Sequence, residues 1–233
     1  MLKTAARNEI YLLSERYPKL GPLQPQVTAA VELLAEAYHR DKKIFVCGNG
    51  GSAADSIHIV GELMKGFTRE RPLPADFQEE IAARFPKEAP YYIANLQSAI
   101  PCASLVSEIG LLSAYSNDCK ADLVYAQQLV GQGRRGDVLI AVSTSGNSPN
   151  ILHAARIAQV MGIRVIALTG QEGGSLRNLA SILLNVPAVF PYQVQEYHLP
   201  IYHAICLALE AEIFECGAQT HSDTAQIGGS VCM

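Results

Sequence analysis

The feature that most constrains this sequence is an apolar run that ends in a glycine-rich turn and continues with helical periodicity. Residues 44–47 (IFVC) are apolar without a break, which is typical of a strand buried on both faces of a parallel sheet. The turn GNGG follows at 48–51, and from Ala53 onward apolar residues recur at helical spacing. This order of elements predicts an α/β fold with a helix N-terminus at the turn, where free N–H groups favour an anion.

The predicted helix carries a titratable pair. Ser52 is its expected N-cap, and Asp55 three residues later completes a weak capping box. His58 and Glu62 are four residues apart, so they share one face of the helix. Isolated pairs at this spacing are more often surface pairs, but the neighbours here are apolar and the helix is expected to be buried nearly all round. Charged groups on such a helix need partners, and the pair is therefore a candidate functional site.

The rest of the chain repeats the alternation of strands and helices. Strands are predicted at 138–142, 163–168 and 181–186, and helices at 121–131, 149–161 and 191–215. Such alternation predicts a parallel, doubly wound sheet. No boundary is visible along the chain, so residues 1–233 are interpreted as a single domain.

The two ends of the chain differ from this pattern. Residues 1–42 contain two amphipathic helices, at 3–17 and 26–40, separated by prolines and a glycine. These helices either form a hairpin for oligomerisation or simply cover the sheet. The tail at 217–233 is small and polar, and it is expected to be loose.

The segment at 70–100 is an insertion that is charged, broken by prolines and longer than a typical connection. A short helix is expected at 75–85 and a break at 89–92, whereas 93–115 can be read as strand or helix. The segment follows directly from the helix with Glu62. We expect it to pack against a neighbouring subunit and to wall the site, the alternative being a surface ornament. Its apolar and aromatic residues include Phe77, Ile81, Phe85, Tyr91 and Tyr92.

Composition and charge exclude several classes of protein. The chain of 233 residues is 49% hydrophobic and 17% charged, with a net charge of −4, which does not indicate binding to nucleic acid or to an anionic membrane. No run reaches transmembrane length, and the N-terminus lacks the apolar stretch of a signal peptide, so a cytoplasmic location is expected. The six cysteines have no CxxC spacing and are expected to be reduced, mostly as small core residues.

Three turns between strands and helices, at 48–52, 143–148 and 169–175, carry hydroxyl or amide groups. Ligands of open α/β sheets bind at the carboxyl ends of the strands, where these turns lie. The turn STSGNS at 143–148 offers many uncharged donors in front of a helix that begins at Pro149, with Ser148 as N-cap. Capping alone does not require the hydroxyls of Ser143, Thr144 and Ser145. We therefore predict a phosphate site at this turn.

A nucleotide cofactor is not expected. Gly48, Gly50 and Ala53 formally match the dinucleotide-binding fingerprint. That motif also needs a second strand that ends in an acidic residue about 20 positions later, and the stretch TRERPLP at 68–74 contains no such strand. The sequence also lacks a GxxxxGK[ST] motif for nucleoside triphosphates.

Five motifs in order resemble the sugar isomerase (SIS) domain proteins, and within them the phosphoheptose isomerases. The motifs are GNGGSAADxxHxxxE from 48, Asn117-Asp118, STSGNS from 143, LTGxxGG from 168 and QExHxxxxH from 195. The resemblance covers about residues 5–215. It implies a flavodoxin-like three-layer α/β/α sandwich, a phosphorylated sugar as substrate, and a homo-oligomer, a tetramer or else a dimer, with sites at subunit interfaces.

The resemblance also implies an activity. Members of the family convert sedoheptulose 7-phosphate to D-glycero-D-manno-heptose 7-phosphate through an enediol, which needs a base at carbon and an acid–base at the sugar oxygens. It assigns these catalytic roles to Glu62 and His203. The positions that match substrate-binding residues are Asn49, Gly50, Gly51, Ser52, Asn117, Asp118, Ser143, Thr144, Ser145, Ser148 and Gln195.

Zinc is a further implication of the resemblance. Some members hold zinc with the residues that match His58, Glu62, Gln195 and His203, whose donor types suit the metal. A zinc-bound Glu62 would be a poor free base, so the metal-binding and base roles compete. His198 is expected to be a buried or interfacial histidine rather than a ligand.

The chain departs from the short heptose isomerases in the length of 70–100, which leaves the identity of the sugar open. The alternative function is a non-catalytic SIS protein, either a regulator that binds sugar phosphates or a partner of the replication initiator. The presence of both Glu62 and His203 favours the enzyme. No helix-turn-helix segment precedes residue 44, which argues against a transcriptional regulator.

Overall fold

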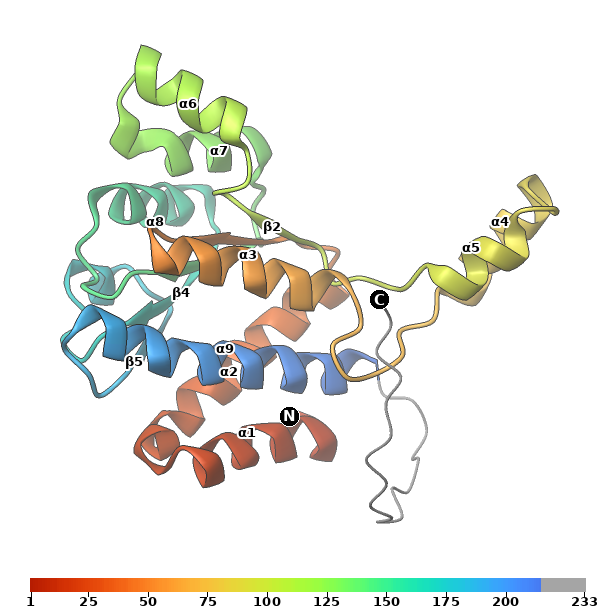
Figure 1. Cartoon of the computed structure of the whole chain (residues 1–233), viewed down its shortest axis with the longest axis horizontal. Coiled ribbons are helices and arrows are strands. Elements are labelled where there is room, and N and C mark those ends of the chain that lie inside the picture. The colour runs from red at the N-terminus through yellow and green to blue at the C-terminus, as the bar shows by residue number, and fades with distance from the viewer. Residues whose placement is uncertain (215–233) are drawn as a thin grey trace.

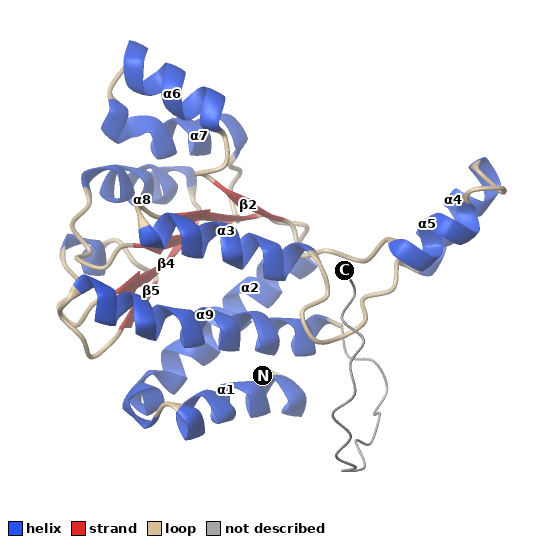
Figure 2. Ribbon diagram, viewed as in Figure 1, coloured by secondary structure: helices blue, strands red, loops and turns tan. Residues whose placement is uncertain are grey.

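Five parallel strands form the centre of the molecule (Figure 2). The computed structural model describes residues 1–214, so the predicted loose tail at 217–233 lies outside the described residues. The strands are Ile44–Cys47 (β1), Cys102–Ser104 (β2), Val138–Val142 (β3), Arg164–Thr169 (β4) and Ile182–Asn185 (β5). Their order is β2-β1-β3-β4-β5, which is the flavodoxin-like order of a doubly wound sheet. The expected parallel α/β fold is confirmed.

Helices cover both faces of the sheet and complete a three-layer sandwich (Figure 1). Ile44 and Val46 enter the core on one face, whereas Phe45 and Cys47 enter it on the other. The first face is covered by α2 (Gln24–His39), α3 (Gly51–Met64) and α9 (Pro191–Ile213). The second face is covered by α7 (Val124–Gln132) and α8 (Pro149–Met161). Because the central strands are buried on both faces, their sequences are unbroken apolar runs.

The N-terminal helices of residues 1–42 form as the sequence predicts. α1 (Thr4–Arg16) packs against α9, and a 3₁₀ turn at Pro18–Leu23 (η1) leads into α2. Val27, Val31 and Leu34 of α2 are buried in the core on the first face. Within one chain these helices therefore cover the sheet, while α1 leaves the large side chains Tyr11 and Leu12 exposed.

The turn after β1 is tighter than the sequence interpretation assumed. α3 begins at Gly51, and Gly50 occupies the N-cap position with a positive φ of 56°, a conformation that favours glycine. A side chain at Gly48 would collide with the carbonyl of Ser52, which is itself buried in the first turn of α3. The expected N-cap role of Ser52 is therefore wrong, because the glycine geometry moves the start of the helix two residues toward the N-terminus.

The start and end of α8 are where the sequence places them. Ser148 is the residue before the helix, Pro149 is its first residue, and Gly162 ends it with a φ of 73°. The Ser148 hydroxyl lies 3.2 Å from the hydroxyl of Ser143 and makes no capping hydrogen bond to the helix. The serine thus occupies the cap position, while its hydroxyl stays beside that of Ser143 in the turn.

The segment at 70–100 forms a helical hairpin that projects from the body of the molecule (Figure 1). Its helices are α4 (Ala75–Arg84), as predicted, and α5 (Ala89–Asn95). The expected break at 89–92 is wrong, because Pro90 lies in the first turn of α5, where its missing N–H costs no helical hydrogen bond. The hairpin buries only Ala89 and leaves large apolar side chains exposed, namely Phe77, Phe85, Tyr91, Tyr92 and Leu96. Within one chain it does not wall the site.

The remaining elements are α6 (Ile109–Asp118) and two 3₁₀ turns, η2 (Ala121–Leu123) and η3 (Ser175–Asn178). The four described cysteines are free: Cys47, Cys102 and Cys206 are buried as expected, whereas Cys119 is exposed. Among the described helices none is both long and apolar enough to cross a membrane.

Candidate active site

The carboxyl ends of β1 and β3 form the point where the chain turns to opposite faces of the sheet. After β1 the chain enters α3 on the first face, and after β3 it enters α8 on the second. Ligands of doubly wound folds bind at this switch point. The two turns are tied together, because the side-chain amides of Asn49 and Asn150 exchange two hydrogen bonds of 2.8 Å each. Tyr125 adds support by donating its hydroxyl proton to the Gly48 carbonyl at 2.9 Å.

The turn at 143–148 is held in place by its own side chains and by the next turn. The backbone N–H of Asn147 donates to the Ser145 hydroxyl at 3.1 Å, and the Asn147 side-chain oxygen accepts the N–H of Ser175 at 2.9 Å. Gly146 has a φ of 65°, and a side chain there would collide with the carbonyl of Gly173. The predicted phosphate turn is therefore preformed, with its hydroxyls gathered in front of α8.

Gln195 joins this edge of the sheet from the first turns of α9. A Cβ atom built on Gly51 would lie 2.5 Å from the side-chain nitrogen of Gln195, so the two residues are immediate neighbours. The structure thus brings Gln195 to the N-terminal turn of α3, and this contact explains the glycine at position 51.

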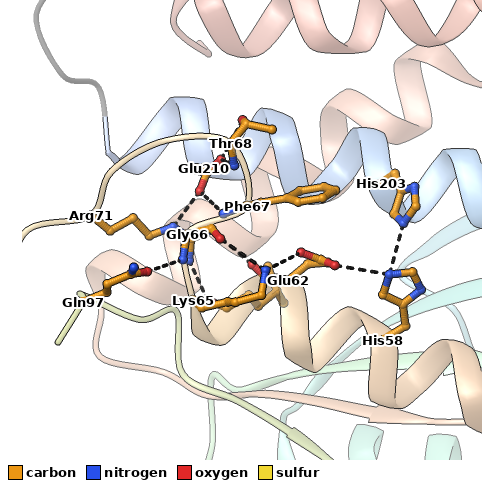
Figure 3. A network of polar contacts seen from close by, with 11 residues as sticks. His58, Glu62, Lys65, Gly66, Phe67, Thr68, Arg71, Gln97, His203 and Glu210 are labelled. Carbon is orange, nitrogen blue, oxygen red and sulfur yellow. Dashed lines mark hydrogen bonds and ion pairs between the residues drawn. The ribbon is translucent and has the colours of Figure 1, made fainter. Parts of the chain in front are cut away.

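A second group lies further along α3 and α9, which run side by side (Figure 1). His58 Nε2 is 3.2 Å from Oε1 of Glu62 and 3.4 Å from Nε2 of His203 (Figure 3). The Lys65 ammonium donates to the other carboxylate oxygen of Glu62 at 3.2 Å. Burial and the neighbouring His58 lower the pKa of His203 below its ordinary value, which favours the neutral ring. The predicted pair on α3 thus gains His203 from α9.

Two residues that the sequence interpretation did not assign to the site orient His58. The Tyr202 hydroxyl donates to Oδ1 of Asp55 at 3.3 Å and lies 3.0 Å from Nδ1 of His58. Burial raises the pKa of both Tyr202 and Asp55. The Tyr202 hydroxyl thus connects Asp55 to Nδ1 of His58 and fixes the ring, while Nε2 of the same ring faces Glu62 and His203. The spacing of Asp55 and His58, one helical turn, was a usable signal, whereas nothing in the sequence marks Tyr202.

The four residues expected to bind zinc do not converge within one chain. Gln195 precedes His203 by eight residues, which is about 12 Å along the axis of α9. The donor types of His58, Glu62 and His203 suit zinc. Within residues 1–214, however, no group of three or more His, Cys, Asp or Glu side chains is arranged to hold a metal ion.

Two further sequence expectations concern Asn117, Asp118 and His198. Asn117 donates to the Asp118 carboxylate at 2.8 Å at the C-terminal end of α6, which stands apart from α3 and α9 (Figure 1). One chain therefore does not bring this pair to the group around Glu62. His198 is fully buried, as expected, and burial lowers its pKa to about 4.

These features define a flavodoxin-like α/β protein with a hydroxyl-rich turn at its switch point and a histidine–carboxylate group further along α3. The sequence model of the SIS domain matches residues 21–85 and 93–170, and the chain belongs to the SIS domain family. The interruption of that match, at 86–92, falls in the hairpin of α4 and α5.

The relatives are curated proteins named phosphoheptose isomerase. The one from Citrifermentans bemidjiense is 36% identical over 197 residues, covering 84% of this chain and 89% of the relative. The one from Sulfurimonas denitrificans is 37% identical over 186 residues, covering 80% and 82%. Among solved structures, phosphoheptose isomerase GmhA from Neisseria gonorrhoeae superposes with a TM-score of 0.66 at 29% identity, covering 88% of this chain and 93% of that one.

Proposed function

We propose that this protein is a phosphosugar aldose–ketose isomerase that interconverts sedoheptulose 7-phosphate and D-glycero-D-manno-heptose 7-phosphate. The observation that carries the proposal is the contact group of His58, Glu62 and His203, which joins a carboxylate to two imidazoles on neighbouring helices. A carboxylate base and an imidazole acid–base are the two groups that aldose–ketose isomerisation needs. The relatives named phosphoheptose isomerase support the choice of a heptose phosphate.

In the proposed reaction Glu62 removes a proton from C1 of the ketose, and the electrons of the C1–H bond form the C1–C2 double bond of an enediol. His203 gives a proton to O2 as the carbonyl is reduced and takes one from O1. Glu62 then returns its proton to C2, which leaves an aldehyde at C1. A neutral His203, favoured by its lowered pKa, has one N–H to donate and one lone pair to accept, so it can serve both oxygens.

We place the sugar phosphate at the turn 143–148, with the N-terminal ends of α8 and α3 directed toward it. Backbone N–H groups and helix dipoles at these ends favour an anion. Serine and threonine hydroxyls add donors without a fixed charge, which permits release of the product. In this proposal Asn49 and Gln195 bind the sugar hydroxyls near the same edge.

A homo-oligomer with shared sites is part of the proposal. Glu62 follows Gly51 by eleven residues, which is about 16 Å along α3, more than a seven-carbon sugar spans from its phosphate. Asn117, Asp118 and Gln195 are likewise distant from Glu62 in one chain. A second copy, in a tetramer or a dimer, supplies the missing half of each site. The domain limits 1–233 and a cytoplasmic location stay predictions from the sequence.

Zinc enters the proposal only as an alternative occupant of the same group. The donor types of His58, Glu62 and His203 of one subunit, with Gln195 of another, suit the metal, although the described residues of one chain are not arranged around a common ion position. When bound, the metal would polarise the sugar oxygens. Glu62 would then be a ligand rather than a free base, so no proton-transfer step is assigned to that state.

The test is incubation of the purified protein with sedoheptulose 7-phosphate and with ketose phosphates of other lengths, followed by detection of the aldose products. We expect aldose from the heptulose. Binding of the sugars without any aldose product would support the non-catalytic alternative and overturn the proposal.

A further inference from the structure

A buried ion pair closes the C-terminal end of α3 (Figure 3). Nε of Arg71 donates to Oε1 of Glu210 at 2.7 Å, and both side chains are 0% exposed. Glu210 also accepts the backbone N–H groups of Phe67 and Thr68, at 2.8 and 2.9 Å. Burial opposes ionisation of Glu210, but these N–H groups and Arg71 hold its pKa below the ordinary value. The carboxylate is therefore charged at neutral pH, and both of its oxygens accept hydrogen bonds.

The guanidinium of Arg71 also reaches the backbone of the proposed base. Its two terminal nitrogens donate to the carbonyl oxygens of Leu63, at 2.7 Å, and of Glu62, at 3.1 Å. Carbonyls in the last turn of a helix have no helical N–H partner, and a positive charge there also stabilises the helix dipole. Glu210 lies seven residues, two helical turns, beyond His203 on α9. The pair thus links the backbone of Glu62 to the helix that carries His203.

The same pair lies at the base of the α4–α5 hairpin. The carbonyl of Arg71 accepts the N–H of Ser98 at 2.8 Å, and the Ser98 hydroxyl donates to the carbonyl of Pro72 at 2.7 Å. The side-chain oxygen of Gln97 accepts the N–H of Gly66 at 2.6 Å. Both ends of the insertion are therefore fixed to the loop that follows α3.

We propose that Arg71 and Glu210 are positioning residues, which hold Glu62 in contact with His58 and in register with His203. The inference rests on the proposed function. A purely structural role explains the pair less well, because the desolvation of two charges offsets most of their attraction and uncharged side chains hold a fold about as well. Uncharged side chains would not replace the Arg71 donor to the carbonyl of Glu62, and they would leave the carbonyl of Leu63 with the N–H of Ile100.

The test is the double variant Arg71→Met with Glu210→Gln, which removes both charges and keeps the side-chain volumes similar. We expect a cooperative fold, a kcat for sedoheptulose 7-phosphate lower by about 10²-fold, as displacement of a catalytic group by about 1 Å produces, and a KM changed by less than about threefold. Affinity for inorganic phosphate, measured by calorimetry, is expected to stay unchanged. Arg71→Lys, which keeps the charge but not the fork of donors, is expected to have an intermediate kcat.

The matched control is Arg164→Met with Glu36→Gln. It removes a half-exposed ion pair of the same residue types, 2.8 Å long, between β4 and α2 and away from the site, so it controls for the loss of the two charges and not for their burial. Its kcat is expected to stay at the wild-type value. The kcat values of the two double variants are compared at equal fractions of folded protein, so that a loss of positioning is not confused with a loss of stability.

A double variant at 71 and 210 with wild-type kcat overturns the inference, as does a kcat loss that the control reproduces. If the double variant does not fold, Arg71→Lys decides: wild-type kcat in that folded variant also overturns it. If the wild-type protein converts none of the sugars, the proposed function fails separately. The positioning role is then judged by the crystal structure of the variant, where an intact 3.2 Å contact between Glu62 and His58 would contradict it.

Discussion

At its N-terminal end α3 begins in a turn built from glycines and backbone groups, whereas at its C-terminal end it stops against a buried ion pair. The first end offers uncharged donors from the turns 48–52 and 143–148. The second end holds the titratable side chains His58 and Glu62, with Arg71 bonded to the last carbonyls. The difference suggests a division of labour. In the proposed function, reversible binding of an anion uses the neutral, preformed donors of the first end, and proton transfer uses the charged groups of the second end, whose positions are fixed from outside the helix.

The largest effect is expected from a substitution that affects only the C-terminal end of α3. Glu62→Gln removes the proposed base at the C-terminal end and leaves the N-terminal turn untouched. We expect kcat to fall by about 10²–10⁴-fold while the affinity for sugar phosphate is retained. Steady-state kinetics together with calorimetric titration of the ligand will measure both. Wild-type turnover in this variant would show that the base is a different residue.

The second prediction concerns His198, which lies on α9 between Gln195 and His203. Its folded pKa of about 4 is below the value of the unfolded chain, so the unfolded state binds more protons between about pH 4 and 6.5. Stability is therefore complete above about pH 6.5 and falls as the pH decreases, by up to about 3 kcal/mol. Urea denaturation at pH 7.5 and pH 5 measures this loss.

His198→Phe supplies the control, because it removes the titrating group from the core. The variant is expected to lose less stability between pH 7.5 and pH 5 than the wild-type protein. An equal loss in both proteins would assign the acid sensitivity to other groups.

A smaller effect is expected at the N-terminal end. Ser148→Ala removes a hydroxyl that is directed to Ser143 and not to the helix backbone, so helix α8 is expected to keep its stability. Loss of one hydrogen bond to a charged phosphate is expected to raise KM by about tenfold with little change in kcat. Kinetics and thermal melting test the two halves of this expectation. A large drop in melting temperature with unchanged KM would show that the serine is only a cap.

The sequence predicted the features at the N-terminal end of α3 more completely than those at its C-terminal end, and the reason is physical. Strand, glycine turn and helix are local signals, and they located β1, β3 and the hydroxyl-rich turn at 143–148. Ser52 was misread as a cap because a glycine with positive φ sets the helix start and leaves no mark in hydrophobic periodicity. Arg71 and Glu210 are separated by 139 residues, and no local pattern links them.

The hairpin at 70–100 shows the same limit. The helix α4 was expected from its own short charged segment, whereas the direction in which α4 and α5 project depends on contacts of Arg71 and Ser98 at their base. Pro90 suggested a break because a proline inside a helix and a proline in its first turn look alike in sequence. The packing of the hairpin on a neighbouring subunit stays a prediction.

Replacement of residues 72–90 by a short Gly-Ser linker tests that prediction. The exposed aromatic side chains of the hairpin lie on an arm whose base, at Arg71, contacts the backbone of Glu62 (Figure 3). A second copy is proposed to complete the site there. We expect the shortened protein to form a weaker oligomer and to have a KM that is several-fold higher, because part of the contact area is lost. Sedimentation and kinetics measure both. An unchanged oligomer with an unchanged KM would identify the hairpin as a surface ornament.

The crystal structure of Glu62→Gln in complex with sedoheptulose 7-phosphate tests the division between the two ends of α3 most directly. The account predicts that the phosphate contacts the hydroxyls of 143–148 in front of Pro149. It also predicts that C1 and C2 of the sugar lie beside the substituted side chain and His203 of a second copy. A phosphate bound at the 169–175 turn, or a sugar whose reacting carbons lie away from position 62 of every subunit, would contradict it.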